Sequence, residues 1–170
     1  MEQEAANKTI EIIPLNECFR PEVNRLVASE WAGPIVVTKG KAKDSSKAEG
    51  FVACMEGRLK GYILYLIEDG RCEILVLHSL EENRGIGTML IRTVEAKARK
   101  EGCRDMWLVT TNDNCRAFRF YQRFGFELAG VNINAMDEVR RIKPSVPLNG
   151  IEGIPLKHEL VFEYMLAGRE

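Results

Sequence analysis

The sequence has few cysteines, and they are poorly arranged for crosslinks. The five are odd in number and widely spaced, and no two form a Cys-x-x-Cys pair: Cys18, Cys54, Cys72, Cys103 and Cys115. Neither a disulfide framework nor a zinc knuckle follows from this spacing. We therefore expect reduced thiols and no metal ion.

Long hydrophobic runs are also lacking. No apolar stretch approaches the roughly 18 residues that a membrane span requires. Residues 1–8 are polar and acidic, without the apolar core of a secretory signal. We expect no membrane partner and a cytoplasmic location.

No block of one charge sign stands out. Lys and Arg number 24 against 25 Asp and Glu, which gives a net charge of -1. A near-neutral chain without a basic block argues against nucleic acid as the main partner. No Ser-, Gly- or Pro-rich linker divides the 170 residues, and 45% of them are hydrophobic. Residues 1–170 are therefore predicted to form a single domain with one sizeable core.

The pattern of extended segments predicts a mixed sheet. β-Branched and alternating apolar residues bounded by turn residues indicate extended segments over residues 9–14, 35–38, 50–55, 59–67, 72–80, 106–110, 126–131 and 156–166. Turn dipeptides such as Asp69-Gly70 join the three segments from 50 to 80 into an antiparallel meander, whereas strand, helix and strand over 72–110 predict a parallel crossover. The fold class is therefore α/β, with a central mixed sheet of about six or seven strands flanked by helices.

Three helices are predicted. The first covers residues 20–29 and begins near Pro21. The second covers residues 83–100, with an apolar stripe at Ile86, Leu90, Val94 and Ala98. The third is short and aromatic, with an N-cap from Asn112 or Asp113 and with Ala117, Phe120, Tyr121 and Phe124 facing inward. Residues 39–49 are expected to be a polar loop, and residues 132–155 a long irregular excursion.

The turn before the second helix contains two glycines, in Asn83-Arg84-Gly85-Ile86-Gly87-Thr88. A strand that enters a helix through such a turn leaves backbone N–H groups at the positive end of the helix dipole, where phosphate can bind. Leu90 stands where a dinucleotide fingerprint needs a third glycine, and Gly87-Thr88-Met89 lacks the lysine of a Walker loop. The turn therefore predicts a phosphorylated ligand of another kind.

This part of the chain resembles the GCN5-related N-acetyltransferase (GNAT) family. The family pattern Asn-x-x-Ala-x-x-x-Tyr followed by Gly-Phe is matched by Asn114, Ala117, Tyr121 and Gly125-Phe126, downstream of the glycine turn. The resemblance implies the acyl-CoA N-acyltransferase fold, with two helical stretches before the meander, and acetyl-CoA as co-substrate. It places the pyrophosphate on the N–H groups of residues 84–88 and the pantetheine arm beside residues 77–80. The implied cofactor contacts are Leu77, His78, Ser79, Leu80, Arg84, Gly85, Ile86, Gly87, Thr88, Asn114 and Tyr121.

For the chemistry, attack of an amine on a thioester needs a base and a proton for the leaving thiolate. The resemblance places Tyr121 as the proton donor, although an aromatic on an inner helix face can also be a packing residue. Glu73, an odd charge in an apolar strand, is the candidate base, directly or through water. His78, on the opposite strand face by period-two counting, is the alternative. Glu82 is expected to turn to solvent, with Arg84 as the nearest cation.

The resemblance implies an N-acetyltransferase that acts on a small-molecule or protein amine. A non-catalytic acyl-CoA sensor and an interaction domain that only keeps the fold are the alternatives. Residues expected to border the acceptor groove are Trp31, Arg140, Arg141, Lys143, His158 and Glu159. The chain could be a monomer or a homodimer, because the strand over residues 160–166 could pair within the chain or with a neighbour.

Overall fold

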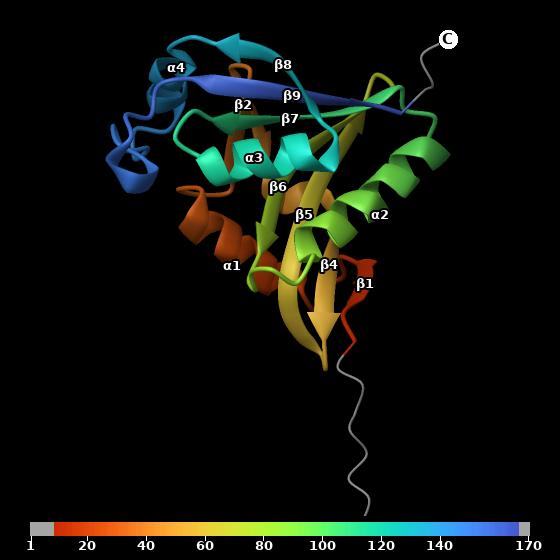
Figure 1. Ribbon diagram of the computed structural model, residues 1–170. Helices are drawn as coiled ribbons and strands as arrows, with labels where there is room; N and C mark the ends of the chain where they lie inside the picture. The colour runs from red at the N-terminus through yellow and green to blue at the C-terminus, as the bar shows by residue number, and fades with distance from the viewer. Residues whose placement is uncertain (1–8, 167–170) are drawn as a thin grey trace, which may run out of the picture.

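The structure is a computed structural model that describes residues 9–166 (Figure 1). In chain order its elements are β1 (Glu11–Pro14), α1 (Arg20–Glu30), β2 (Ile35–Thr38), β3 (Lys41–Asp44), the 3-10 helix η1 (Ser45–Lys47), β4 (Glu49–Met55), β5 (Arg58–Glu68), β6 (Arg71–Ser79), α2 (Ile86–Lys100), β7 (Asp105–Thr111), α3 (Cys115–Phe124), β8 (Glu127–Asn132), α4 (Ala135–Ile142), the 3-10 helix η2 (Ile151–Gly153) and β9 (Glu159–Met165). Within these residues no helix is both long and apolar enough to cross a bilayer.

Seven of the strands form one mixed sheet in the order β1-β4-β5-β6-β7-β9-β8. Every neighbouring pair is antiparallel except β6 and β7, which are parallel. Helix α2 makes the crossover between these two strands, since parallel neighbours cannot be joined by a tight turn. The predicted mixed α/β sheet is confirmed.

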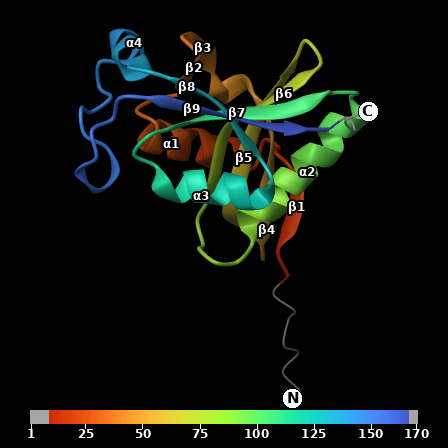
Figure 2. The same cartoon turned by 45° about the horizontal axis from the view of Figure 1, so that its top comes forward.

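Helices cover both faces of the sheet (Figures 1 and 2). Helices α2 and α3 pack on one face, and α1 packs on the other. The predicted stripe of α2 is confirmed, because Ile86, Leu90, Val94 and Ala98 are all at most 1% exposed. The β2–β3 hairpin lies on the α1 face, where Val36 joins the α1 core, and α4 packs against Val37 of the same hairpin.

Residues 39–49 are not the predicted polar loop. Strand β3 pairs with β2 through a turn in which Lys39 and Gly40 both have positive φ, of 49° and 72°. Such a two-residue turn matches the twist of a hairpin. Two helical stretches precede the meander, as the family resemblance implied, but the second is only the 3-10 helix η1, which follows the hairpin.

The excursion over residues 132–155 is also more ordered than predicted. It contains α4, whose Met136 and Val139 are buried against Leu156. These two residues lie three apart and so share one helix face. The prediction of a wholly irregular segment is wrong, because a helix of two turns gives only a weak periodic signal.

The C-terminal strand β9 lies inside the sheet, between β7 and β8. It pairs with β7 along its whole length, from Thr111 opposite Glu159 to Asp105 opposite Met165. The strand over residues 160–166 therefore pairs within the chain, and the sheet edges are β1 and β8.

Candidate functional site

The parallel strands β6 and β7 separate halfway along their length. They pair only where Arg71–Ile74 face Asp105–Leu108. Beyond this point β6 stays paired with β5 as far as Ser79, and β7 stays paired with β9 as far as Thr111. The facing edges of β6 and β7 therefore have no strand partner in this stretch, although backbone N–H and C=O groups require one.

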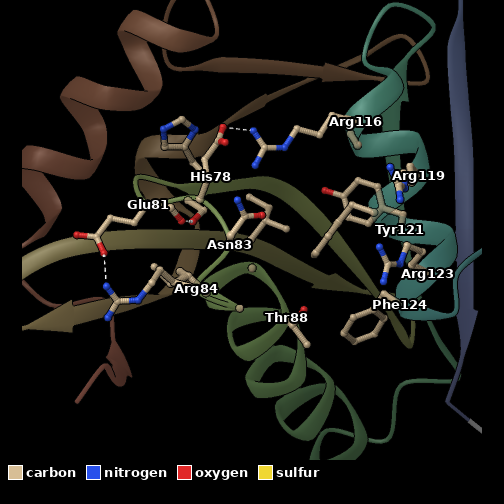
Figure 3. Close-up of a pocket in the computed structure, with 18 of the residues that line it drawn as sticks. His78, Glu81, Asn83, Arg84, Thr88, Arg116, Arg119, Tyr121, Arg123 and Phe124 are labelled. Atoms are coloured by element: carbon tan, nitrogen blue, oxygen red, sulfur yellow. Dashed lines mark hydrogen bonds and ion pairs between the residues drawn. The ribbon is translucent and has the colours of Figure 1, made fainter. Parts of the chain in front are cut away.

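Two adjoining cavities occupy this opening. A pocket of about 110 Å³ lies between the separated strands and is lined by Trp31 of the α1 end and by Thr110 of β7. A larger cleft of about 790 Å³ continues outward between the glycine turn and α3 (Figure 3). The two cavities share four lining residues: Leu77, Asn114, Ala117 and Tyr121. An elongated ligand can therefore reach from the outer cleft to the gap between the strands.

The two glycines of the turn are required for different physical reasons. Gly85 has a φ of 70°, which only glycine adopts without strain. Gly87 lies in the first turn of α2, and a Cβ there would lie 3.1 Å from Cζ of Phe120 on α3. Both glycines line the outer cleft. The first N–H groups of α2 have no partner inside the helix, so they can receive an anion in the cleft.

Asn114 caps α3. Its Oδ1 accepts the N–H of Ala117 at 3.0 Å. The predicted caps Asn112 and Asp113 are wrong, because both side chains bind the segment before β9 instead. Asn112 Oδ1 accepts the N–H of His158 at 2.9 Å, and Asp113 Oδ2 accepts the N–H of Ile151 at 2.9 Å. The tertiary contacts of this segment therefore decide which of the three polar residues forms the cap.

Tyr121 lies where the two cavities meet, with its hydroxyl directed toward the cleft (Figure 3). Its ring is held by three aromatic neighbours, with centroid distances of 5.3 Å to Phe120, 5.6 Å to Phe126 and 6.0 Å to Phe162. Burial raises the pKa of the Tyr121 phenol above its ordinary value. A phenol that stays neutral at physiological pH is suited to donate a proton.

Glu73 does not reach either cavity. It lies where β6 and β7 are still paired, opposite Trp107, and is 3% exposed. The Thr38 hydroxyl donates to its Oε1 at 2.6 Å, and Lys43 forms an ion pair with its other oxygen. Both carboxylate oxygens are thus held by the β2–β3 hairpin, which argues against Glu73 as the base.

His78 lies on the same face of the sheet as Glu73, contrary to the period-two expectation. Val76 pairs with Leu64 and Ile74 pairs with Tyr65, so Leu75 is an extra residue in β6. This bulge shifts the alternation by one residue, and both Leu75 and Val76 face the α1 core. His78 therefore points toward that core.

The ring of His78 is packed between two aromatic side chains. Its centroid lies 5.8 Å from that of Trp31 and 5.6 Å from that of Tyr62. His78 also lines the outer cleft, whereas Trp31 lines the inner pocket. The bulge thus brings an imidazole to the cavities from the face opposite α2 and α3.

Ser79, the last residue of β6, and Leu80, the residue after it, differ in their position relative to the cleft. Ser79 lines the cleft, and its hydroxyl donates to the carbonyl of Glu81 at 2.6 Å. Leu80 is not among the residues that line the cleft. This residue is 40% exposed, and its N–H donates to the Lys60 carbonyl at 2.9 Å. The structure therefore gives no support for Leu80 as a cofactor contact.

The charges of the turn are paired. Arg84 lines the cleft and lies 3.3 Å from Glu81, a carboxylate that also forms an ion pair with Lys60. The Lys60 ammonium lowers the pKa of Glu81. Glu82 is mostly exposed, as predicted, but at the rim of the cleft it forms an ion pair with Arg116. Arg84 is thus not the only cation near this turn.

Arginines that the sequence pattern did not single out form the opposite wall of the cleft. Three of them, Arg116, Arg119 and Arg123, come from α3 and line the cleft (Figure 3). They are spaced along one side of a helix that contains no Asp or Glu. This basic stripe on an aromatic helix was visible in the sequence and is the signal that could have identified them.

Of the residues expected at the acceptor groove, Trp31 lines the inner pocket, and the other five line neither of these two cavities. Lys143 donates to the carbonyls of Trp31 and Ile35, and burial lowers its pKa. The others bind their own surroundings: Arg140 the Pro147 and Leu156 carbonyls, Arg141 the Glu138 carboxylate, His158 the Asn134 N–H and Glu159 the Asn132 amide. Among residues 9–166, no group of three His, Cys, Asp or Glu side chains could hold a metal ion.

A family model described as "Acetyltransferase (GNAT) family" matches residues 15–126. The chain therefore belongs to the GNAT acetyltransferase family, whose activity is acyl transfer from acetyl-CoA. Its sequence is 37% identical over 156 residues to the "Uncharacterized protein YdhI" of Bacillus subtilis (strain 168), a match that covers 91% of this chain and 98% of the relative.

Solved structures share the fold. An "IAA acetyltransferase" from Bacillus cereus ATCC 14579 aligns with a TM-score of 0.69 and 16% identity, over 92% of this chain and 99% of the other. A GNAT family acetyltransferase from Elizabethkingia anophelis "with acetyl-CoA bound" aligns with a TM-score of 0.66 and 17% identity, over 92% of this chain and 97% of the other. At these identities the likeness shows the acyl-CoA N-acyltransferase fold.

Proposed function

We propose that this protein transfers the acetyl group of acetyl-CoA to a primary amine of a small molecule or a protein, in the cytoplasm and without a metal ion. The observation that carries the proposal is Tyr121, a buried neutral phenol placed where the outer cleft meets the inner pocket. The family membership and the acetyl-CoA-bound structural neighbour support acetyl-CoA as the donor.

The cavities suggest how the donor binds. The diphosphate lies on the N–H groups of residues 84–88. The left-handed backbone conformation of Gly85 and the absence of a side chain at Gly87 allow it to approach closely. The pantetheine arm runs into the opening between β6 and β7 beside Leu77, His78 and Ser79. Its amides pair with backbone groups of β6 that lack a strand partner there. The thioester then lies in the inner pocket, near Tyr121.

The acceptor approaches from the α1 face, past Trp31. His78, directly or through a water molecule, removes a proton so that the amine is a neutral nucleophile. The nitrogen attacks the thioester carbon, and backbone N–H groups of the bulged part of β6 stabilise the oxyanion. The C–S bond then breaks, and the Tyr121 phenol protonates the leaving thiolate. The nitrogen of the new amide releases its extra proton, directly or through water, to the Tyr121 phenolate, which restores the phenol. The products are the acetylated amine and CoA.

A thiol-release assay across small amines and peptide amino groups tests the proposal, with Tyr121→Phe as the variant. We expect kcat to fall about a hundredfold, because a general acid is lost, while acetyl-CoA affinity stays within about twofold. Acetyl-CoA binding without thiol release from any amine would favour the sensor alternative. A folded wild type that neither binds acetyl-CoA nor turns over would overturn the proposal.

A further inference from the structure

The outer cleft is strongly basic in a chain that is close to neutral. Five arginines line it, against the two glutamates Glu81 and Glu82. The lining therefore carries a net charge of +3, whereas the whole chain carries -1. A concave basic surface of this kind concentrates anionic ligands.

Three of the five arginines already have an acidic partner. Arg84 pairs with Glu81 at 3.3 Å, Arg92 pairs with Glu95 at 2.7 Å, and Arg116 pairs with Glu82. The two remaining cleft arginines, both on α3, have no such acidic partner among the described residues.

Arg119 and Arg123 form no ion pair or hydrogen bond with any other part of the chain that the structure describes, residues 9–166. They lie four residues apart, so their side chains are neighbours on one face of α3. Figure 3 places both on the wall of the cleft that faces α2 and the glycine turn. Two adjacent guanidinium groups with open donors are suited to hold one phosphate group bidentately.

We propose that Arg119 and Arg123 form a subsite for a phosphate monoester and that its ligand is the 3′-phosphate on the ribose of CoA. The inference rests on the proposed function. Acetyl-CoA carries two anionic groups, the diphosphate and this 3′-phosphate. The N–H groups at the start of α2 account for the diphosphate, which leaves the monoester, with nearly two negative charges at neutral pH, for the two free guanidinium groups.

The two walls of the cleft can hold the donor at two separate points. The glycine turn with Arg84 forms one wall, and α3 forms the other. A donor held on both walls is fixed at two points, so its pantetheine arm enters the opening between β6 and β7 in a defined direction. Arg119 and Arg123 are therefore specificity residues, since they distinguish CoA from analogues that lack the 3′-phosphate.

Calorimetric titration with CoA and with 3′-dephospho-CoA tests this inference directly. We expect wild type to bind CoA at least about tenfold more tightly than dephospho-CoA, because charge-assisted hydrogen bonds to the phosphate are lost in the analogue. The variant Arg119→Gln/Arg123→Gln should lose that preference by binding CoA more weakly, while its affinity for dephospho-CoA stays within about twofold. Arg25→Gln, an exposed position of α1 on the other face of the sheet, is the matched control and should keep the preference.

Three outcomes are distinct. Equal binding of CoA and dephospho-CoA by wild type would overturn the subsite, as would a double variant that weakens both ligands equally, since the arginines would then hold the diphosphate. Binding of neither ligand by wild type would instead count against the proposed function. Both arginines are exposed, so we expect the double variant to keep the wild-type circular dichroism spectrum.

Discussion

The imidazole of His78 and the indole of Trp31 meet edge to face, with their ring centroids 5.8 Å apart. This contact joins the end of β6 to the end of α1, and it places the imidazole beside an inner-pocket residue. The contact depends on the extra residue Leu75, which turns His78 to the α1 face.

We expect His78→Ala to lower kcat about a hundredfold in steady-state thiol-release kinetics, with the KM for acetyl-CoA little changed, because the base that neutralises the amine is lost. Added imidazole should restore part of the activity. Trp31→Phe keeps an aromatic contact and serves as the control, with a smaller change in kcat. Unchanged kcat in His78→Ala would leave water as the base.

Glu73 is expected to stabilise the fold and not to act in the reaction. Glu73→Gln should lower the free energy of unfolding by about 3 kcal/mol, since it leaves the Lys43 ammonium unpaired against a largely buried surface. The kcat per folded molecule should stay within about twofold of wild type. Chemical denaturation and steady-state kinetics on the same preparation measure both quantities.

The double variant Lys43→Met/Glu73→Gln provides the control for this pair. It removes both charges, so its loss of stability should be smaller than the sum of the two single losses. A large fall in kcat for Glu73→Gln with little change in stability would restore Glu73 as the base.

The buried tyrosines should make the protein sensitive to alkali. Burial raises the pKa values of Tyr62, Tyr65 and Tyr121 above the ordinary value of 10.0. Their contribution to stability is therefore complete below about pH 10. Above it, the unfolded chain releases protons that the folded chain keeps, and stability falls by up to about 1.4 kcal/mol per pH unit for each tyrosine. Urea denaturation from about two pH units below to about one pH unit above the ordinary tyrosine pKa measures this slope.

Tyr62→Phe separates one of these contributions. The Tyr62 hydroxyl is buried and has no hydrogen-bond partner among the described residues. Its removal should therefore stabilise the protein at neutral pH by about 1 kcal/mol and reduce the alkaline slope. A destabilised Tyr62→Phe variant with an unchanged slope would contradict this account.

Gly150 is expected to be required for space. A Cβ at this position would lie 2.0 Å from Oδ2 of Asp113, the oxygen that accepts the N–H of Ile151. Gly150→Ala should lower the free energy of unfolding by about 2 kcal/mol. Gly130→Ala is the control, because a Cβ there meets nothing within 4 Å. Equal stability of the two variants in denaturant titrations would show that the segment moves aside without loss.

The sequence predicted the features that depend on local periodicity. The apolar stripe from Ile86 to Ala98 predicted the crossover helix, and turn residues such as Asp69-Gly70 predicted the meander. Both signals are contained in a few neighbouring residues. The parallel pairing of β6 with β7 follows from the order strand, helix, strand, whereas its end at Ile74 is visible only in the structure.

The site was harder to predict because it depends on tertiary contacts. A single bulge at Leu75 reverses the face of every later residue in β6, and period-two counting cannot detect it. Thr38 and Lys43 of the hairpin bind Glu73 from positions 35 and 30 residues away in the sequence, so local patterning shows only an unusual charge in an apolar strand. Arg119 and Arg123 were visible as a stripe, but the wall they form exists only after α3 packs beside α2.

The most direct test of the central claim is calorimetric titration of the folded wild-type protein with acetyl-CoA, alongside Gly87→Trp. We expect saturable binding at one site per chain by wild type. We expect no binding by the variant, because an indole at Gly87 would occupy the phosphate side of the cleft. The absence of binding by folded wild type, or undiminished binding by a folded Gly87→Trp variant, would contradict the account.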